Sequence, residues 1–168
     1  AVRETPLSPV GLFVEGGGNL ERHPAYQAGL FTIQDQSAQL PALALAPLPG
    51  SRVLDLCAAP GGKTTQLAEC MDDTGAVLAF DTYAERCRMI AQAAHRLGHT
   101  SIRAAVMDAA QFDPRLENTA DRVLLDVPCS GLGILRRKPD IKYRMTPEKI
   151  VDIRAAQAAI LRTGARYV

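Results

Sequence analysis

The sequence lacks several features that would assign it to a specialised class of protein. No apolar run approaches the roughly 18 residues needed to span a bilayer, and no leader with a cleavage site opens the chain. No internal repeat is present. The net charge is only +1, so overall charge does not single out nucleic-acid binding. We expect a cytoplasmic protein without membrane contact.

Cysteine is scarce as well. The four cysteines, at positions 57, 70, 87 and 129, include no C-x-x-C pair and are too few for a disulfide scaffold. His95 and His99 are four residues apart, but no acidic or thiol ligand shares their spacing. We therefore expect reduced thiols, no metal site, and two histidines at a solvated helix end.

What is present fits one globular domain. Apolar residues make up 47% and charged residues 22% of the 168 residues, which argues against disorder. From Arg52 onward, short apolar runs alternate with helix-length segments, which is typical of βαβ units around a parallel sheet. We expect residues 1–50 to form a lead-in that ends in a helix, and residues 51–168 to form the core.

The core is expected to hold four strands rich in Val, Leu and Ile, because a sheet covered on both faces buries both sides of each strand. They comprise residues 52–56, 76–80, 102–107 and 122–127. Two amphipathic helices accompany them. The first turns Tyr83, Cys87, Ile90, Ala94 and Leu97 inward and ends at Gly98. The second is capped by Thr146 and turns Ile150, Ile153, Ala156 and Ile160 inward.

The lead-in is harder to read. Residues 1–30 are expected to be irregular, with a turn at residues 16–19 between short extended segments. Residues 31–33 alternate like a short strand. Asp35 or Ser37 is expected to cap a helix that runs to about Ala46, with Pro41 in its first turn.

The strongest functional signal is a loop of small residues between the first core strand and the following helix. It consists of Cys57, Ala58, Ala59, Pro60, Gly61, Gly62 and Lys63. Small residues let the backbone approach a ligand closely, and the helix N-terminus offers free N–H groups. Such a loop suits a carboxylate or a phosphate.

A phosphate-binding P-loop is the first alternative, because Gly62-Lys63-Thr64 matches the end of the pattern G-x-x-x-x-G-K-S/T. That pattern requires glycine at position 57, where this chain has Cys57. Pro60 also removes one of the N–H donors that a phosphate cradle uses. Both departures weigh against a P-loop.

Three aspartates follow the ends of the later strands, namely Asp81, Asp108 and Asp126. The carboxyl ends of parallel strands share one edge of a sheet, and Asp81 stands 20 positions after Gly61, where a dinucleotide fold places the acid that binds ribose. Each aspartate alone would more often serve a turn. Together they predict a nucleoside-bearing cofactor. The residues leave S-adenosylmethionine and NAD open, although the missing G-x-G-x-x-G weakens NAD.

Cys129 follows Asp126, Val127 and Pro128 in a turn at the same edge. A buried structural cysteine and an exposed reactive thiol are both consistent with this position. Farther on, residues 136–144 hold five positive charges against Asp140 alone. The five are Arg136, Arg137, Lys138, Lys142 and Arg144. Contact with nucleic-acid phosphates is one interpretation, with Tyr143 stacking on a base, and a solvated loop is the other.

These segments together resemble the RNA cytosine-5 methyltransferases, a family that includes the bacterial small-subunit ribosomal RNA enzyme. The resemblance extends from about Leu30 to the end and is carried by residues 31–37, 55–65, 126–131 and 136–140. It implies a Rossmann-like S-adenosylmethionine-dependent methyltransferase fold, α/β with a parallel doubly wound sheet. It also implies that Cys57 to Lys63, Asp81, Asp108 and Asp126 contact the cofactor, and that ribosomal RNA is the partner.

The resemblance further implies a two-cysteine reaction on carbon 5 of cytosine. A thiolate of a Thr-Cys motif adds to carbon 6, which activates the ring, and the cysteine after proline, here Cys129, assists elimination while Asp126 orients the groups. No cysteine follows Cys129, and Thr-Cys occurs nowhere in the chain. We therefore expect a sheet incomplete at the C-terminus and an isolated chain that binds cofactor and RNA without methylating. The rivals are a non-catalytic cofactor- or RNA-binding module and a P-loop nucleotide-binding protein.

Overall fold

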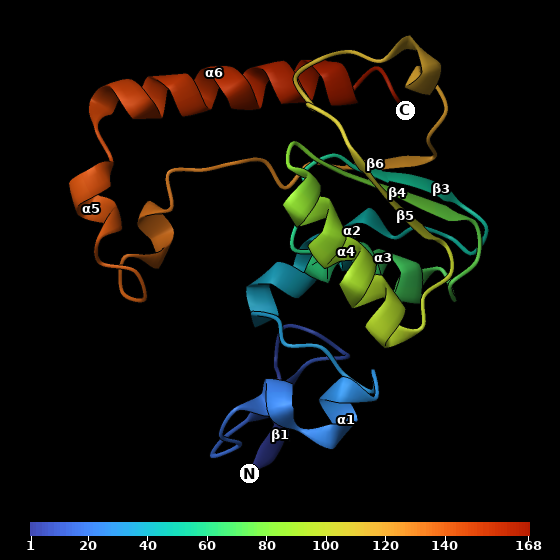
Figure 1. Cartoon of the computed structure of the whole chain (residues 1–168), viewed down its shortest axis with the longest axis vertical. Coiled ribbons are helices and arrows are strands. Elements are labelled where there is room, and N and C mark those ends of the chain that lie inside the picture. The colour runs from blue at the N-terminus through green and yellow to red at the C-terminus, as the bar shows by residue number, and fades with distance from the viewer.

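The centre of the computed structural model, which describes residues 1–168, is a four-stranded parallel sheet (Figure 1). Its strands are β3 (Arg52–Asp55), β4 (Ala76–Asp81), β5 (Ile102–Val106) and β6 (Arg122–Leu124). Their spatial order is β5-β4-β3-β6, so the chain reverses direction across the sheet between β3 and β6. This confirms the α/β, Rossmann-like expectation. All four strands were correctly placed, although β6 ends three residues before Val127.

Helices cover both faces of the sheet. On one face lie α2 (Leu40–Leu45), α3 (Gly62–Cys70) and α4 (Ala84–Leu97), and α6 (Pro147–Gly164) crosses the other face (Figure 1). Consecutive residues of β3 point to opposite faces. Val53 belongs to the buried cluster of Leu67 and Ile90, whereas Leu54 belongs to that of Ile160 and Tyr167. None of the helices combines the length and apolar character that crossing a bilayer requires.

The first 30 residues are more regular than the sequence indicated. The strands β1 (Val2–Glu4) and β2 (Leu12–Val14) form an antiparallel hairpin, followed by a 3-10 helix (Leu20–Arg22) and α1 (Pro24–Gln27). The glycines at 16–18 therefore lead from a strand into a 3-10 helix. The sequence did not indicate the hairpin, because its strands have only three residues each and show no apolar alternation.

The expected strand at residues 31–33 was wrong. The Arg96 guanidinium of α4 donates to the Phe31 carbonyl at 3.0 Å and to the Tyr26 carbonyl at 2.6 Å. A side chain of α4 therefore binds this segment, in place of backbone pairing with a strand. The cap at Asp35 was confirmed, since its side chain accepts from the Ser37 N–H and begins a 3-10 helix (Gln36–Gln39) that leads into α2.

Both amphipathic helices begin as expected and Gly98 ends the first, but not every residue expected to point inward is buried. Gly98 ends α4 with a φ of 79°, and Thr146 caps α6. Tyr83 precedes α4 and is 65% exposed, because at the N-cap it lies beyond the part of the helix that packs on the sheet. In α6 only Ile160 of the four expected residues is buried, and Ala156 is exposed. The first half of α6 extends past the sheet, as does α5 (Ile141–Arg144) (Figure 1).

The solvated position expected for His99 was also wrong. Its side chain is only 9% exposed, with Nε2 at 3.7 Å from Glu69 and Nδ1 at 3.6 Å from Asp73. Asp73 also accepts hydrogen bonds from the N–H and hydroxyl groups of Thr100 and Ser101. The turn after α3 therefore covers the histidine, a contact between residues too far apart in sequence for helical periodicity to indicate.

We expect Leu67→Ala to destabilise the fold strongly, because Leu67 is fully buried between α3 and the sheet. The decrease should be about 2–5 kcal/mol of unfolding free energy, measured by urea denaturation. Leu161→Ala on α6 is the matched control, since Leu161 is 61% exposed, and it should cost less than about 0.5 kcal/mol. Equal decreases in the two variants would contradict this assignment of the core.

Candidate functional site

The loop from β3 into α3 packs tightly under α4. Gly61 has a φ of 108°, and a Cβ there would lie 3.2 Å from the Cα of Ile90. The loop uses its own N–H groups: Ala58 donates to the Phe80 carbonyl, Gly61 donates to the Ala58 carbonyl, and Pro60 has no N–H. A phosphate cradle needs such groups free, so the backbone disfavours a P-loop.

Asp55, the last residue of β3, is hydrogen-bonded to Thr64 at the start of α3. The carboxylate is 1% exposed and accepts a hydrogen bond from the Thr64 hydroxyl at 2.7 Å, while its other oxygen, Oδ1, is buried without a partner. Burial raises the pKa of Asp55 to about 6, although the hydrogen bond from the Thr64 hydroxyl works in the opposite direction. No pattern in the sequence distinguished Asp55 from other strand residues.

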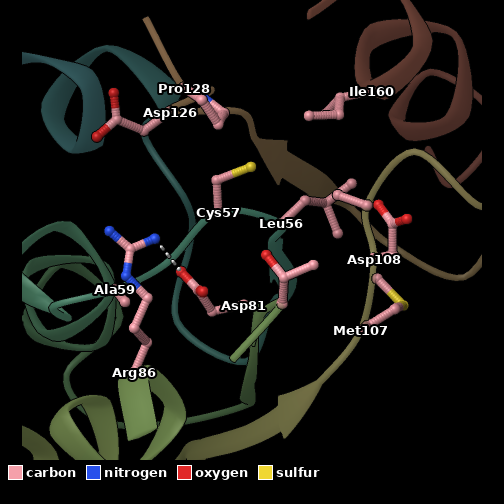
Figure 2. Close-up of a pocket in the computed structure, with 12 residues that line it drawn as sticks. Leu56, Cys57, Ala59, Asp81, Arg86, Met107, Asp108, Asp126, Pro128 and Ile160 are labelled. Carbon is pink, nitrogen blue, oxygen red and sulfur yellow. Dashed lines mark hydrogen bonds and ion pairs between the residues drawn. The ribbon is translucent and has the colours of Figure 1, made fainter. Parts of the chain in front are cut away.

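A cavity of about 190 Å³ opens at the carboxyl edge of the sheet (Figure 2). Its lining includes all three predicted aspartates, Asp81, Asp108 and Asp126, together with Cys57 and Ala59 of the loop. The apolar part of the wall is formed by Leu56, Met107, Ala109, Pro128 and Ile160. The three acids therefore meet at one site, as their places at the strand ends predicted.

The three aspartates are held differently. Asp81 is 5% exposed, and the Arg86 guanidinium of α4 lies 3.4 Å from its Oδ2 (Figure 2). Asp108 accepts from the Ala110 N–H and the Gln111 amide, so it also serves the local turn. Asp126 is 55% exposed and pairs at 2.6 Å with Lys63, the lysine that a P-loop would direct at phosphate.

Two cysteines lie near the cavity with different exposures. Burial, followed by the negative charges of Asp55 and Asp81, raises the pKa of the Cys57 thiol to about 11. Cys57 therefore stays protonated at neutral pH and acts as part of the wall. Cys129 is exposed, and it lines neither cavity, although its neighbour Pro128 lines the first.

A second cavity of about 190 Å³ borders the first, and Cys57, Ala59 and Asp126 line both. Its other residues are Ile33, Gln34, Ala38, Asp55, Ala58, Pro60, Gly62 and Lys63. The lead-in thus supplies one wall of this cavity, and together the two volumes reach the range of small-molecule sites.

The expected basic residues lie in the segment between β6 and α6, and all five are exposed. The Nζ of Lys142 lies 4.7 Å from the ring centroid of Tyr143, which is 80% exposed. Arg137 is not free, since it pairs with Asp35 at 2.9 Å.

The sequence reasoning missed three contributors to the site, namely Asp55, Arg86 and the partnership of Lys63 with Asp126. Arg86 follows Asp81 by five positions and lies in the first turn of α4. A basic residue just inside a helix that follows an acidic strand end is a signal that could have been used. Lys63 and Asp126 are 63 residues apart, so sequence spacing gave no indication of their pairing.

Comparisons with known proteins show the family to which the chain is similar. Residues 42–168 match the family described as 16S rRNA methyltransferase RsmB/F. The chain is similar to the probable ribosomal RNA small subunit methyltransferase B of Bacillus subtilis, with 45% identity over 85% of this chain and 32% of that protein. It is also similar to the human 28S rRNA (cytosine(4447)-C(5))-methyltransferase, with 41% identity over 82% of this chain and 17% of that protein.

Solved structures of other proteins superimpose on this fold. The crystal structure of PH0851 superimposes with a TM-score of 0.93 at 34% identity and covers 100% of this chain and 38% of its own. The structure of NSun6 from Pyrococcus horikoshii with SFG gives a TM-score of 0.78 at 29% identity, over 89% of this chain and 38% of its own. The chain spans about a third of the bacterial relative's length.

We expect ionisation of Asp55 to make the fold less stable as pH rises. Its folded-state pKa of about 6 lies above the unfolded value of about 3.9, so its contribution is fully present below the unfolded value and disappears as the pH passes about 6. Between about pH 4 and about pH 7, the unfolding free energy of the parent should fall by roughly 2 kcal/mol relative to Asp55→Asn. Parallel stability profiles in urea titrations would show that Asp55 is not the titrating group.

Proposed function

The chain belongs to the 16S rRNA methyltransferase RsmB/F family, and on this basis we propose that its two cavities bind S-adenosylmethionine and a cytosine of ribosomal RNA for methylation at carbon 5. The observation that carries the proposal is the meeting of Asp81, Asp108 and Asp126 with the small-residue loop in one cavity.

The first cavity suits the adenosine part of the cofactor. Asp81 has acceptors for the two ribose hydroxyls, and Arg86 holds its carboxylate from the solvent side. The adenine would lie beside Asp108, against the apolar wall of Met107 and Ile160. An archaeal relative, NSun6, was solved with SFG, an analogue of S-adenosylmethionine, which supports this cofactor over NAD and ATP.

The shared wall suits the reacting groups. When bound, S-adenosylmethionine supplies an electrophilic methyl group on a cationic sulfonium. The carboxylates of Asp126 and the neighbouring acids favour that positive charge. We assign the second cavity to the cytosine, because Lys63 and Gln34 offer hydrogen-bond donors there and Asp126 borders both ligands.

The cysteine chemistry is assigned by family membership. We assign elimination of the methylated product to the exposed Cys129, and the attack on carbon 6 to the Thr-Cys thiolate of this family, a motif that residues 1–168 do not contain. Cys57 is unsuited to either role because its thiol stays protonated. Asp126 orients cofactor and base from between the two cavities.

Ribosomal RNA is the proposed partner, and the cytoplasm is the proposed compartment. The relatives named above act on ribosomal RNA according to their names. The basic residues of the segment 136–144 are all exposed, which supports their contact with RNA phosphates.

We expect Asp81→Ala to weaken S-adenosylmethionine binding by about 1–3 kcal/mol, or roughly 5- to 150-fold, because the ribose hydroxyls no longer have a charged acceptor. Isothermal titration calorimetry measures this directly, with NAD and ATP as competing candidates. Glu85→Ala is the matched control. Glu85 is an acid in the first turn of α4, next to Arg86 in sequence, and its side chain is 81% exposed. ATP binding tighter than S-adenosylmethionine binding would reject the proposal.

Neutralising Arg136 and Lys138 should make RNA binding less sensitive to salt, because a protein that neutralises fewer phosphates releases fewer counterions from the RNA. For single strands, the slope of log affinity against log salt should change by about 0.7 for each phosphate that is no longer neutralised. Arg88→Gln on the exposed surface of α4 serves as the control and should leave the slope unchanged. An identical slope in the double variant would return these residues to a solvated loop.

A further inference from the structure

The ion pair between Asp35 and Arg137 joins parts of the chain that are 102 residues apart. Asp35 belongs to the lead-in, and Arg137 belongs to the basic segment between β6 and α6. The Arg137 guanidinium donates one bond, at 2.9 Å, to Oδ2 of Asp35. The pair therefore ties the segment assigned to RNA to the opposite side of the site.

Asp35 is a fixed partner in this pair. Its other oxygen, Oδ1, accepts from the N–H of Ser37 at 3.0 Å and from the Ser37 hydroxyl at 2.7 Å. These bonds, followed by the bond from Arg137, lower the pKa of Asp35 to about 2. The carboxylate is thus ionised and oriented at every pH near neutrality.

The pair lies next to the second cavity. Ile33, Gln34 and Ala38, which flank Asp35 in sequence, line that cavity, and the Gln34 amide donates to the Ala38 carbonyl at 3.0 Å. Arg137 is therefore held beside the wall of the cavity assigned to the target cytosine.

Arg137 retains the means to bind an anion. A guanidinium has five N–H donors, of which Asp35 takes one, and the Arg137 side chain is 73% exposed. Arginine binds phosphate with two parallel N–H groups, an arrangement that a fixed guanidinium makes with little entropic cost. Arg136 and Lys138 add positive charge on either side.

We propose that Asp35 is a positioning residue that orients Arg137 to bind the phosphate of the nucleotide whose base enters the second cavity. This inference rests on the proposed function, because it takes that cavity as the cytosine site. The contrasting arrangement is a latch, in which Asp35 competes with RNA for Arg137 and must be displaced.

The direction in which Asp35→Asn changes the RNA affinity distinguishes these two arrangements. Asp35→Asn removes a negative charge near the RNA, so a competing latch predicts tighter RNA binding. A positioning residue predicts the opposite, about fivefold weaker binding, because the guanidinium is no longer oriented. The probe is a short fluorescein-labelled single-stranded oligoribonucleotide rich in cytidine, titrated by fluorescence anisotropy over a series of salt concentrations.

Three further variants complete the experiment. Arg137→Ala should weaken binding about tenfold and change the salt slope by about 0.7, which a purely structural role would not do. Adding Asp35→Asn to Arg137→Ala should weaken binding no further, because the two residues act through one interaction with the RNA. Asp140→Asn is the matched control: it removes an acid of the same segment without a side-chain cap bond, and binding should stay equal or become slightly tighter.

Tighter binding by Asp35→Asn, or unchanged affinity and slope in Arg137→Ala, would overturn the inference alone. S-adenosylmethionine titration of every variant checks that the fold and the first cavity are intact, because neither substitution touches that cavity. Failure of the unmodified chain to bind the oligoribonucleotide would overturn the RNA part of the proposed function, and this inference with it.

Discussion

The close approach of the β3–α3 loop to helix α4 determines where the groups of the site lie. The loop passes so close to α4 that a Cβ on Gly61 would lie 3.2 Å from the Cα of Ile90. Asp55, at the end of β3, accepts a hydrogen bond from Thr64 of α3. Residues at or after the carboxyl ends of β4, β5 and β6, namely Asp81, Asp108 and Asp126, line the first cavity together with the loop residues Cys57 and Ala59. The two cavities are the space left on either side of the loop, which is why Cys57 and Ala59 line both.

Three basic side chains in and around the site each form an ion pair with an aspartate. Lys63 pairs with Asp126, Arg86 with Asp81, and Arg137 with Asp35. A cationic sulfonium needs carboxylates near it, whereas an RNA phosphate needs guanidinium groups. The Lys63 side chain is 19% exposed and lines the second cavity, whereas Arg137 is exposed and lines neither cavity. The pairs thus let one small site accept ligands of opposite charge.

Sequence reasoning located the parts of the site that depend on strand order and missed those that depend on packing. Buried strands and the residues that follow them are recognisable from local apolar runs, so Asp81, Asp108 and Asp126 were assigned to one edge correctly. The hairpin of β1 and β2 and the pairing of Arg137 with Asp35 depend on backbone pairing or on contacts across many residues. Helical periodicity also placed Ala156 inside, whereas it is exposed in the structure.

The most direct test of the central claim is a crystal structure of the chain with S-adenosylhomocysteine. The account predicts that the ribose hydroxyls lie within hydrogen-bonding distance of Asp81, the adenine beside Asp108, and the sulfur on the side of Asp126. The second cavity should stay open next to Gln34 and Lys63. A ligand bound elsewhere, or one that fills the second cavity with its adenine, would contradict the assignment of the two cavities.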